Sequence, residues 1–516
     1  MFQTNYYQQQ PQQAFNAPPP MYHQQGNYLS ANEKLNQNYY YDRPPAPEPG
    51  KETFDETFKV EKPKFHDVPF TILFLATVAG FFVVAGITLR NYATSYSYEG
   101  SSIYDSDNSF SLNTNTIILF AFVIVVALVL SLATIAVARI FPRNFITTSL
   151  ILNVILGLGT SIAYLAKGYY SAGIVFLIFA ALTAFSYWTM RSRIPFSATV
   201  LTIIIDVMKQ YPSTWIITAI GFLGIGAFSA LFSATVVASY MKWGDETSES
   251  YNHARLVGLL VFVFFAGYYI SEVMKNVIHV TVSGIFGTWY YLSKSAAGMP
   301  KFQALGALKR ALTYSFGSIC FGSLIVTFIQ LLRQGVQIAR QNALNNGEGI
   351  QACLLLCTEC FIYVIEWLVR YFNHYAYSYV ALYGKSYLKS ARDTHYIFSY
   401  KGMDALVNDC LIGTALGMYC TFVGYVCALL AYLYLRFTKP GYNAQGTYYA
   451  PVVAFTFLIS LQICNIINSV IRSGTATFFL ALAKDPEVYQ VSYPDRFNEV
   501  FRDYPEVLDK IRTRDY

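Results

Sequence analysis

Charged residues are scarce in this sequence. Asp, Glu, Lys and Arg make up only 13% of its 516 residues, whereas 54% of the residues are hydrophobic. Soluble domains carry roughly 25% charged residues, so most of this chain cannot be an ordinary soluble domain. The net charge of +6 is modest and gives no signature of nucleic-acid binding.

Catalytic and nucleotide-binding motifs are also missing. The sequence contains no His-Glu-x-x-His, no Gly-x-Ser-x-Gly, no phosphate-binding loop and no Rossmann glycine pattern. We therefore expect neither an enzyme nor a cofactor. Without an ATP-binding domain, any uphill transport would have to draw on the membrane potential or on an ion gradient.

Cysteines outside apolar segments are absent, which argues against a disulfide framework. All eight cysteines fall in or beside apolar runs. Cys353, Cys357 and Cys360 share one helix face, as metal ligands can. No matching His or Cys group lies near them, so we favour packing of small residues at a helix interface and expect no metal.

Long apolar runs dominate what is present. Ten of them approach the roughly 20 residues that a helix needs to span a bilayer, which predicts an all-α, polytopic membrane helix bundle with the lipid bilayer as its surroundings. The first 67 residues are polar, so we expect no cleavable signal peptide and a first span that acts as the insertion signal. The predicted spans are Val68–Leu89, Thr116–Val137, Phe145–Ala166, Ser171–Met190, a fifth within Ser213–Tyr240, a sixth from about Leu256, Leu312–Leu332, and three within Ala352–Tyr383, Cys410–Leu435 and Tyr449–Leu480.

The chain divides into three predicted parts, which are a tail (1–67), a membrane domain (68–480) and a charged C-terminal tail (481–516). The first tail is rich in Gln, Asn, Tyr and Pro and should be disordered. Its Pro19, Pro20 and Tyr22 form a Pro-Pro-x-Tyr motif of the kind that WW domains bind. The motif makes a WW-domain ubiquitin ligase a candidate partner, although a chance match explains four residues equally well.

Residues 195–209 are too polar to span a bilayer. Pro195 suits the first turn of a helix, and Ile203 and Val207 oppose Asp206 and Lys209. We therefore predict a helix that lies at the cytosolic membrane surface before the fifth span.

Short loops rich in Lys and Arg indicate the orientation. With ten spans, four such loops fall on the same side as both termini, so the positive-inside rule predicts that this side is the cytosol. Two further pairs, Arg333 with Arg340 and Arg436 with Lys439, disagree because they would lie outside. The four loops carry Arg139 and Arg143; Arg191 and Arg193; Lys294, Lys301, Lys309 and Arg310; and Lys385, Lys389, Arg392 and Lys401.

The sixth span turns polar on one side only. Glu272, Lys275, Asn276, His279 and Ser283 follow one another at steps of three and four, which places them on one stripe of a helix. A charge at membrane depth costs roughly 2.5–3.5 kcal/mol or more, so such residues normally face a partner helix or a wet cavity. The aromatic residues that follow, Trp289, Tyr290 and Tyr291, are typical of a membrane–water boundary.

Two other spans carry polar stripes. In the eighth, Glu366 and Arg370 have the favourable spacing for an intrahelical pair, while Glu359 has no such local partner. The eighth stripe continues through Asn373, Tyr377 and Ala381, and the tenth span adds Gln462, Asn465, Ser469 and Arg472.

Any single residue of the three polar stripes is explained by a polar contact that only stabilises helix packing. For the set we favour a hydrophilic path, because two unpaired acids and a histidine are hard to bury otherwise. A cation such as a quaternary ammonium would be held by aromatic faces and a carboxylate. The candidates are Trp289, Tyr290, Tyr377 and Tyr383, with Glu272 or Glu359 as the counter-charge.

Six longer blocks are more specific than any short motif, namely EVMKNVIHVTVSGIFGTWYY (272–291), ALKRALTYSFGSICFGSL (307–324), FNHYAYSYVALYGK (372–385), GTATFFLALAKDPE (474–487), PFTILFLATVAGFFVVAGITLR (69–90) and RSRIPF (191–196). These blocks resemble the choline transporter-like family, most closely its fungal, pH-nine-sensitive branch. The resemblance covers nearly the whole membrane region and implies a ten-span plasma-membrane protein with cytosolic termini. For the animal members it implies uptake of choline or ethanolamine.

The leading hypothesis is therefore a secondary transporter that moves a small cation such as choline by alternating access. His279, near Glu272 and Lys275, would let external pH affect transport. The alternative is a membrane sensor or scaffold whose tails recruit cytosolic partners. A membrane-embedded lipid enzyme or scramblase is a more distant third, because no catalytic signature supports it.

Overall fold

The computed structural model describes residues 64–95, 114–243, 253–295, 298–401, 403–439, 449–502, 504 and 507–508. Every regular element in these ranges is a helix, which confirms the predicted all-α class. The predicted disordered tail up to residue 63, together with its Pro-Pro-x-Tyr motif, lies outside the described residues.

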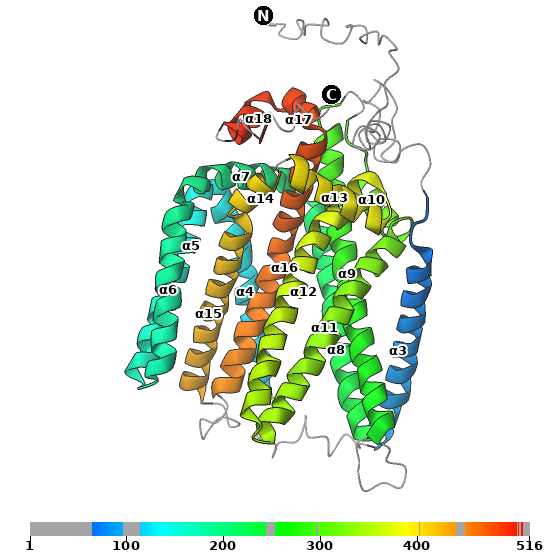
Figure 1. Cartoon of the computed structure of the whole chain (residues 1–516), viewed down its shortest axis with the longest axis vertical. Coiled ribbons are helices and arrows are strands. Elements are labelled where there is room, and N and C mark those ends of the chain that lie inside the picture. Colours follow the sequence, from blue (N-terminus) through cyan, green and yellow to red (C-terminus); the bar gives the residue numbers. More distant parts are fainter. Residues whose placement is uncertain are drawn as a thin grey trace, which may run out of the picture. The chain divides into compact units, whose positions relative to one another are not determined.

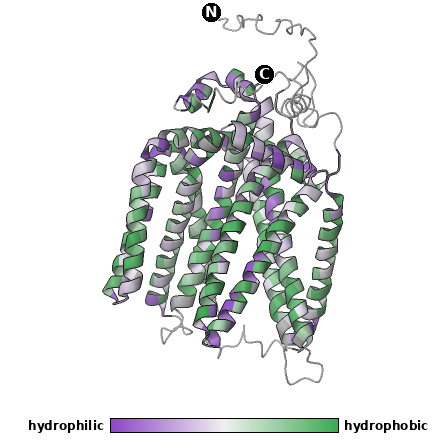
Figure 2. Ribbon diagram, in the orientation of Figure 1, coloured by the Kyte–Doolittle hydropathy of each residue, from purple (hydrophilic) through white to green (hydrophobic). Residues whose placement is uncertain are grey.

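Ten helices among the described residues are long and apolar enough to cross a membrane, as predicted. They run side by side and are apolar over most of their lengths (Figures 1 and 2). They are α3 (Val68–Ser95), α4 (Thr114–Ile140), α5 (Pro142–Ala166), α6 (Tyr170–Met190), α8 (Ser213–Trp243), α9 (His253–Leu292), α11 (Phe316–Asn345), α12 (Gly349–Tyr383), α15 (Ile412–Thr438) and α16 (Tyr449–Lys484).

Short helices gather at one end of the long ones, which we call the short-helix end (Figure 1). A large cluster of buried apolar residues lies there and joins α7, α9, α12 and α16. The short elements are the 3₁₀ turn η1 (Arg191–Arg193) and the helices α7 (Ile194–Gln210), α10 (Gln303–Leu312), α13 (Tyr387–Lys401), α14 (Met403–Asp409), α17 (Pro486–Ser492) and α18 (Pro494–Phe501).

Helix α7 matches the helix predicted near residues 195–209. Proline lies in its first turn, where the missing N–H is not needed. Ile203 and Val207 are buried, whereas Lys209 is exposed. The buried side packs on α4, α5 and α16. Its position at a membrane surface stays a prediction.

Helix α9 is the hub of one half of the bundle. It packs against α3, α8, α11, α12 and α16 along its length and against α10 and α17 near the short-helix end. A helix with so many neighbours can bury side chains on several faces, and its polar stripe therefore meets other helices. Helix α12 ends at Tyr383, because the next residue, Gly384, has a left-handed backbone (φ 60°) that stops the helix, as glycine commonly does.

The assignment of Arg333 and Arg340 to an outside loop is wrong. Helix α11 does not end near Leu332 but continues to Asn345, so both arginines lie within the helix. Their side chains form ion pairs with α12. They are therefore helix residues and not loop charges.

The three cysteines on α12 also differ from expectation. Cys353, Cys357 and Cys360 are exposed on the helix surface and do not pack at an interface between described helices. In the part of the chain that the structure describes, no group of three His, Cys, Asp or Glu side chains is arranged to hold a metal ion.

A short segment before α3 is tied to two other helices. The Asp67 carboxylate accepts hydrogen bonds from the Ser318 hydroxyl (2.6 Å) and the Tyr387 backbone N–H (3.0 Å). A Cβ atom at Gly317 would overlap the backbone of His66 and Asp67, so the segment lies directly on α11. The contacts connect the first span to α11 and α13.

Replacing Asp67 with alanine should lower the free energy of unfolding by about 2 kcal/mol, because hydrogen bonds to a charged group each contribute roughly 1.5–3 kcal/mol. Thermal unfolding of the purified protein in detergent measures the loss. Lys64→Ala changes an exposed residue of the same segment and should leave the melting temperature unchanged. Equal melting temperatures for the two variants would contradict the proposed role of Asp67.

Candidate functional site

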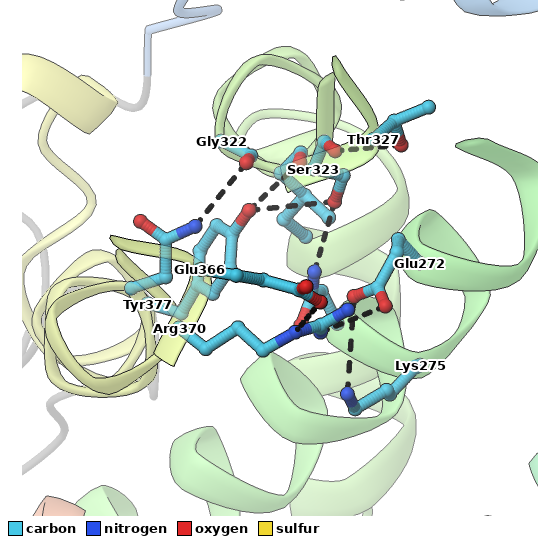
Figure 3. Close-up of polar contacts among 11 residues, drawn as sticks. Glu272, Lys275, Gly322, Ser323, Thr327, Glu366, Arg370 and Tyr377 are labelled. Atoms are coloured by element: carbon cyan, nitrogen blue, oxygen red, sulfur yellow. Dashed lines mark hydrogen bonds and ion pairs between the residues drawn. The ribbon is translucent and has the colours of Figure 1, made fainter. Parts of the chain in front are cut away.

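Glu272 on α9 meets Arg370 on α12 near the middle of both helices. The Arg370 guanidinium lies 2.8 Å from Glu272 Oε1 and also donates to Glu366 Oε1 at 2.9 Å (Figure 3). Lys275 Nζ lies 3.8 Å from the other oxygen of Glu272. Glu272 and Glu366 are both buried. One guanidinium therefore joins two carboxylates from two helices.

Helix α11 adds two more ion pairs. Arg333 lies 2.9 Å from Glu366, and Arg340 lies 3.0 Å from Glu359, which also accepts a hydrogen bond from Gln337 (2.6 Å). The intrahelical pair between Glu366 and Arg370 is confirmed. The expectation that Glu272 and Glu359 are unpaired is wrong, because Arg370 of α12 pairs with Glu272 and Arg340 of α11 pairs with Glu359.

A group of neutral polar residues follows toward the short-helix end. Asn276 donates to the Ser323 hydroxyl at 2.9 Å, and this hydroxyl also lies 3.3 Å from the Tyr377 hydroxyl (Figure 3). Asn373 donates to the carbonyl of Gly322 at 3.2 Å and accepts from the Tyr387 hydroxyl. Burial raises the pKa of Tyr387 to about 12, so this phenol keeps its proton at ordinary pH.

Two histidines stack on each other one turn further along. The His279 and His374 rings lie 4.2 Å apart and nearly parallel. His279 Nδ1 is 2.6 Å from the Ser473 hydroxyl of α16, and its Nε2 is 2.8 Å from the His374 carbonyl. Both histidines lie in spans that the sequence predicts. Their contact is not predictable from the sequence, because it joins residues 95 positions apart.

The last polar contacts lie at the short-helix end. The Tyr291 hydroxyl lies 2.6 Å from Asp485 Oδ2 and 2.7 Å from the Tyr383 hydroxyl. The Tyr290 hydroxyl donates to the Asp485 carbonyl at 2.9 Å. Sequence reasoning missed Asp485, which follows the last residue of α16. Its place just before Pro486 was the only local signal.

We call these groups of contacts together the polar ladder. It follows α9, α11 and α12 through three candidate membrane spans, with α16 beside it. The ladder holds four acids, four Lys or Arg residues and two histidines, so it is not a purely acidic cation path. Its members are Glu359, Arg340, Arg333, Glu366, Arg370, Glu272, Lys275, Asn276, Ser323, Tyr377, Asn373, His279, His374, Tyr383 and Asp485.

Other predicted site residues lie elsewhere. Trp289 is 17 residues from Glu272 on the same helix, or about 25 Å along its axis, and it packs near Tyr489 and Tyr493. Tyr290 stacks on Tyr489. The structure therefore does not bring Trp289 or Tyr290 to Glu272.

Part of the polar stripe of the tenth span forms a hydrogen bond within its own helix. Arg472 donates to the Asn465 side chain at 3.2 Å, which makes an intrahelical bond on α16. The backbone carbonyl of Arg472 lies 3.3 Å from His374 Nε2. The stripe thus touches the polar ladder through its backbone at the histidine pair.

Comparison with known proteins agrees with this architecture. A family model described as "Plasma-membrane choline transporter" matches residues 174–487, which include every member of the polar ladder. The chain belongs to the choline transporter-like family. It is a multi-pass membrane protein, and its relatives place it in the fungal, pH-nine-sensitive branch.

The relatives cover nearly the full length. Protein PNS1 of Debaryomyces hansenii is 58% identical over 96% of this chain and 98% of its own. The Candida albicans Protein PNS1 is 56% identical over 98% and 96% of the two chains. The Saccharomyces cerevisiae Protein PNS1 is 50% identical over 89% and 88%. Their shared name states no substrate.

Proposed function

We propose that this protein moves a small organic cation of the choline type across the plasma membrane by alternating access, without ATP hydrolysis and with both termini in the cytosol. The description of the family model supports the substrate class and the membrane. The observation that carries the proposal is the Glu272–Arg370 contact between α9 and α12 (2.8 Å) within two candidate spans.

Both carboxylates at this junction already have partners, which suggests how a cation would act. A substrate ammonium would replace Arg370 beside Glu272. Arg370 would keep Glu366, its second partner at 2.9 Å. The exchange would release α9 from α12 without leaving a charge unpaired. A ligand shifts a conformational equilibrium only through different affinity for the two states, and an exchange of ion pairs supplies that difference.

Aromatic contact would complete the site. A quaternary ammonium has no N–H to donate, so each aromatic face that it touches contributes roughly 0.5–2 kcal/mol. Tyr377 is the predicted aromatic residue connected to the Glu272 region, because Ser323 links it to Asn276. An inside-negative potential would then favour inward movement by roughly 2.3 kcal/mol per charge for each 100 mV.

Uptake of radiolabelled choline into proteoliposomes tests the proposal. With the purified full chain and an inside-negative potassium-diffusion potential, we expect saturable uptake that Glu272→Gln abolishes. Glu348→Gln is the matched control, because it makes the same change at an exposed glutamate that precedes α12 and is not part of the polar ladder. It should retain most of the uptake.

The outcomes separate the alternatives. Absence of uptake by the folded, correctly inserted wild-type protein would overturn choline as the substrate. Equal uptake by wild type and Glu272→Gln would remove Glu272 from the path. A variant without residues 1–63 keeps the Asp67 contacts and should keep its uptake, whereas a scaffold acting through this tail would lose its activity.

A further inference from the structure

Two adjoining cavities lie away from the polar ladder. The first, of about 390 Å³, lies between the α4–α5 turn, α7 and α18 and has a polar lining that includes Arg143, Thr199 and Glu499. The second, of about 310 Å³, lies between α4, α5 and α15. Phe141 and Asn144 line both cavities, so the two meet at the start of α5.

Charges of both signs line the first cavity. Arg143 is exposed and makes no ion pair or side-chain hydrogen bond with the described residues. Glu499 accepts one hydrogen bond, from the Thr199 hydroxyl at 2.8 Å, and forms no ion pair within the described part of the chain. Arg496, also in the lining, is bound to Asp206 at 2.8 Å. One guanidinium and one carboxylate are thus left to receive a ligand.

The second cavity is apolar and follows the helices. Its lining includes Phe145 and Leu152 of α5 and Tyr419 and Phe422 of α15. Ten residues separate the start of α5 from Leu152, which corresponds to about 15 Å along the helix. This length is about half of the roughly 30 Å hydrocarbon core of a bilayer.

The junction of the two cavities coincides with the ends of two candidate spans. One span ends at Ile140 and the next begins at Pro142. Ile140 and Phe141 expose 66% and 57% of their surface, as lipid-facing residues would. The polar cavity therefore lies at the level expected for headgroups, and the apolar cavity at the level expected for acyl chains.

We propose that the two cavities together bind one zwitterionic phospholipid, whose headgroup carries a phosphate and an amine. Arg143 binds the phosphate, and Glu499 binds the ammonium. One acyl chain lies along Phe145, Leu152 and Tyr419. A soluble phosphate compound would leave the apolar cavity unfilled, and a purely anionic lipid would place its charge against Glu499.

Native mass spectrometry of the delipidated full chain tests this proposal with four probes. These are dioleoyl-phosphatidylethanolamine, dioleoyl-phosphatidylglycerol, dioleoylglycerol and glycerophosphoethanolamine. We expect one equivalent of phosphatidylethanolamine to bind at least tenfold more tightly than each of the other three. Arg143→Ala and Glu499→Gln should each weaken its binding at least tenfold.

Matched variants complete the experiment. Arg191→Ala changes an exposed arginine of η1 that lines neither cavity, so it should bind the lipid like wild type. Leu152→Trp should fill the apolar cavity and prevent binding, and its melting temperature shows whether it folds. Equal binding of phosphatidylglycerol, equal binding of glycerophosphoethanolamine, or wild-type binding by Arg143→Ala and Glu499→Gln would each overturn the proposal.

Discussion

Replacing Arg370 with methionine should lower the free energy of unfolding by about 3 kcal/mol. Removing one partner of a buried ion pair typically costs roughly 3–5 kcal/mol, because the other charge stays buried without compensation. Arg370 lies 2.8 Å from Glu272 and 2.9 Å from Glu366. Without it, Glu366 keeps Arg333, but Glu272 keeps only Lys275 at 3.8 Å. Thermal unfolding of the purified protein in detergent gives the measurement.

The double variant Arg370→Met/Glu272→Gln separates the ion pair from general disruption. Because it also removes the Glu272 carboxylate that has lost its arginine, we expect the double variant to recover most of the lost stability. Arg340→Met is the matched control, since Glu359 keeps its hydrogen bond from Gln337 and the expected loss is about 1 kcal/mol. A double variant that is no more stable than Arg370→Met would show that Glu272 is not the reason for the loss.

Replacing Gly322 with alanine should have the second largest effect. An added Cβ atom would overlap the Tyr377 hydroxyl and the Tyr387 ring, and each of these groups is already fixed by its own hydrogen bonds. Overpacking of this kind costs roughly 1–3 kcal/mol. It should also shift Tyr377 away from Ser323. We expect a lower melting temperature and a lower yield of monodisperse protein.

The same helix supplies the control. Gly335 on α11 has no atom within 4 Å of an added Cβ. Alanine forms helix better than glycine by about 1 kcal/mol, so Gly335→Ala should be neutral or stabilising. If the two alanine variants had the same melting temperature, the close packing around Gly322 would be refuted.

The sequence predicts the spans well because their signal is local. An apolar run of the right length predicts a membrane-spanning helix without any knowledge of the neighbouring helices. This local signal predicts all ten spans. Helix α11 was predicted too short because its last turns carry Arg333, Gln337 and Arg340, which interrupt the apolar run. These residues remain helical because α12 supplies acids opposite two of them.

The contacts of the candidate site are likewise predictable only where they are local in sequence. The Glu366–Arg370 bond was predictable because four residues along a helix make one contact. The Glu272–Arg370 pair was not, because its members are 98 positions apart and only the packing of α9 on α12 joins them. The polar stripes indicated which helix faces need partners, but they did not indicate which partners. For that reason the sequence suggests two unpaired acids where the structure has two paired ones.

The length of α9 has a consequence for permeation. Its 40 residues extend about 60 Å, twice the roughly 30 Å of hydrocarbon in a bilayer. The end that holds Tyr290 and Tyr291 is covered by α10, α16 and α17, so protein rather than lipid surrounds it. We therefore expect the dielectric barrier to be much thinner than the protein. Asp485 and the tyrosines bonded to it are buried in this end, so a charged group there lies among polar protein atoms and not in hydrocarbon.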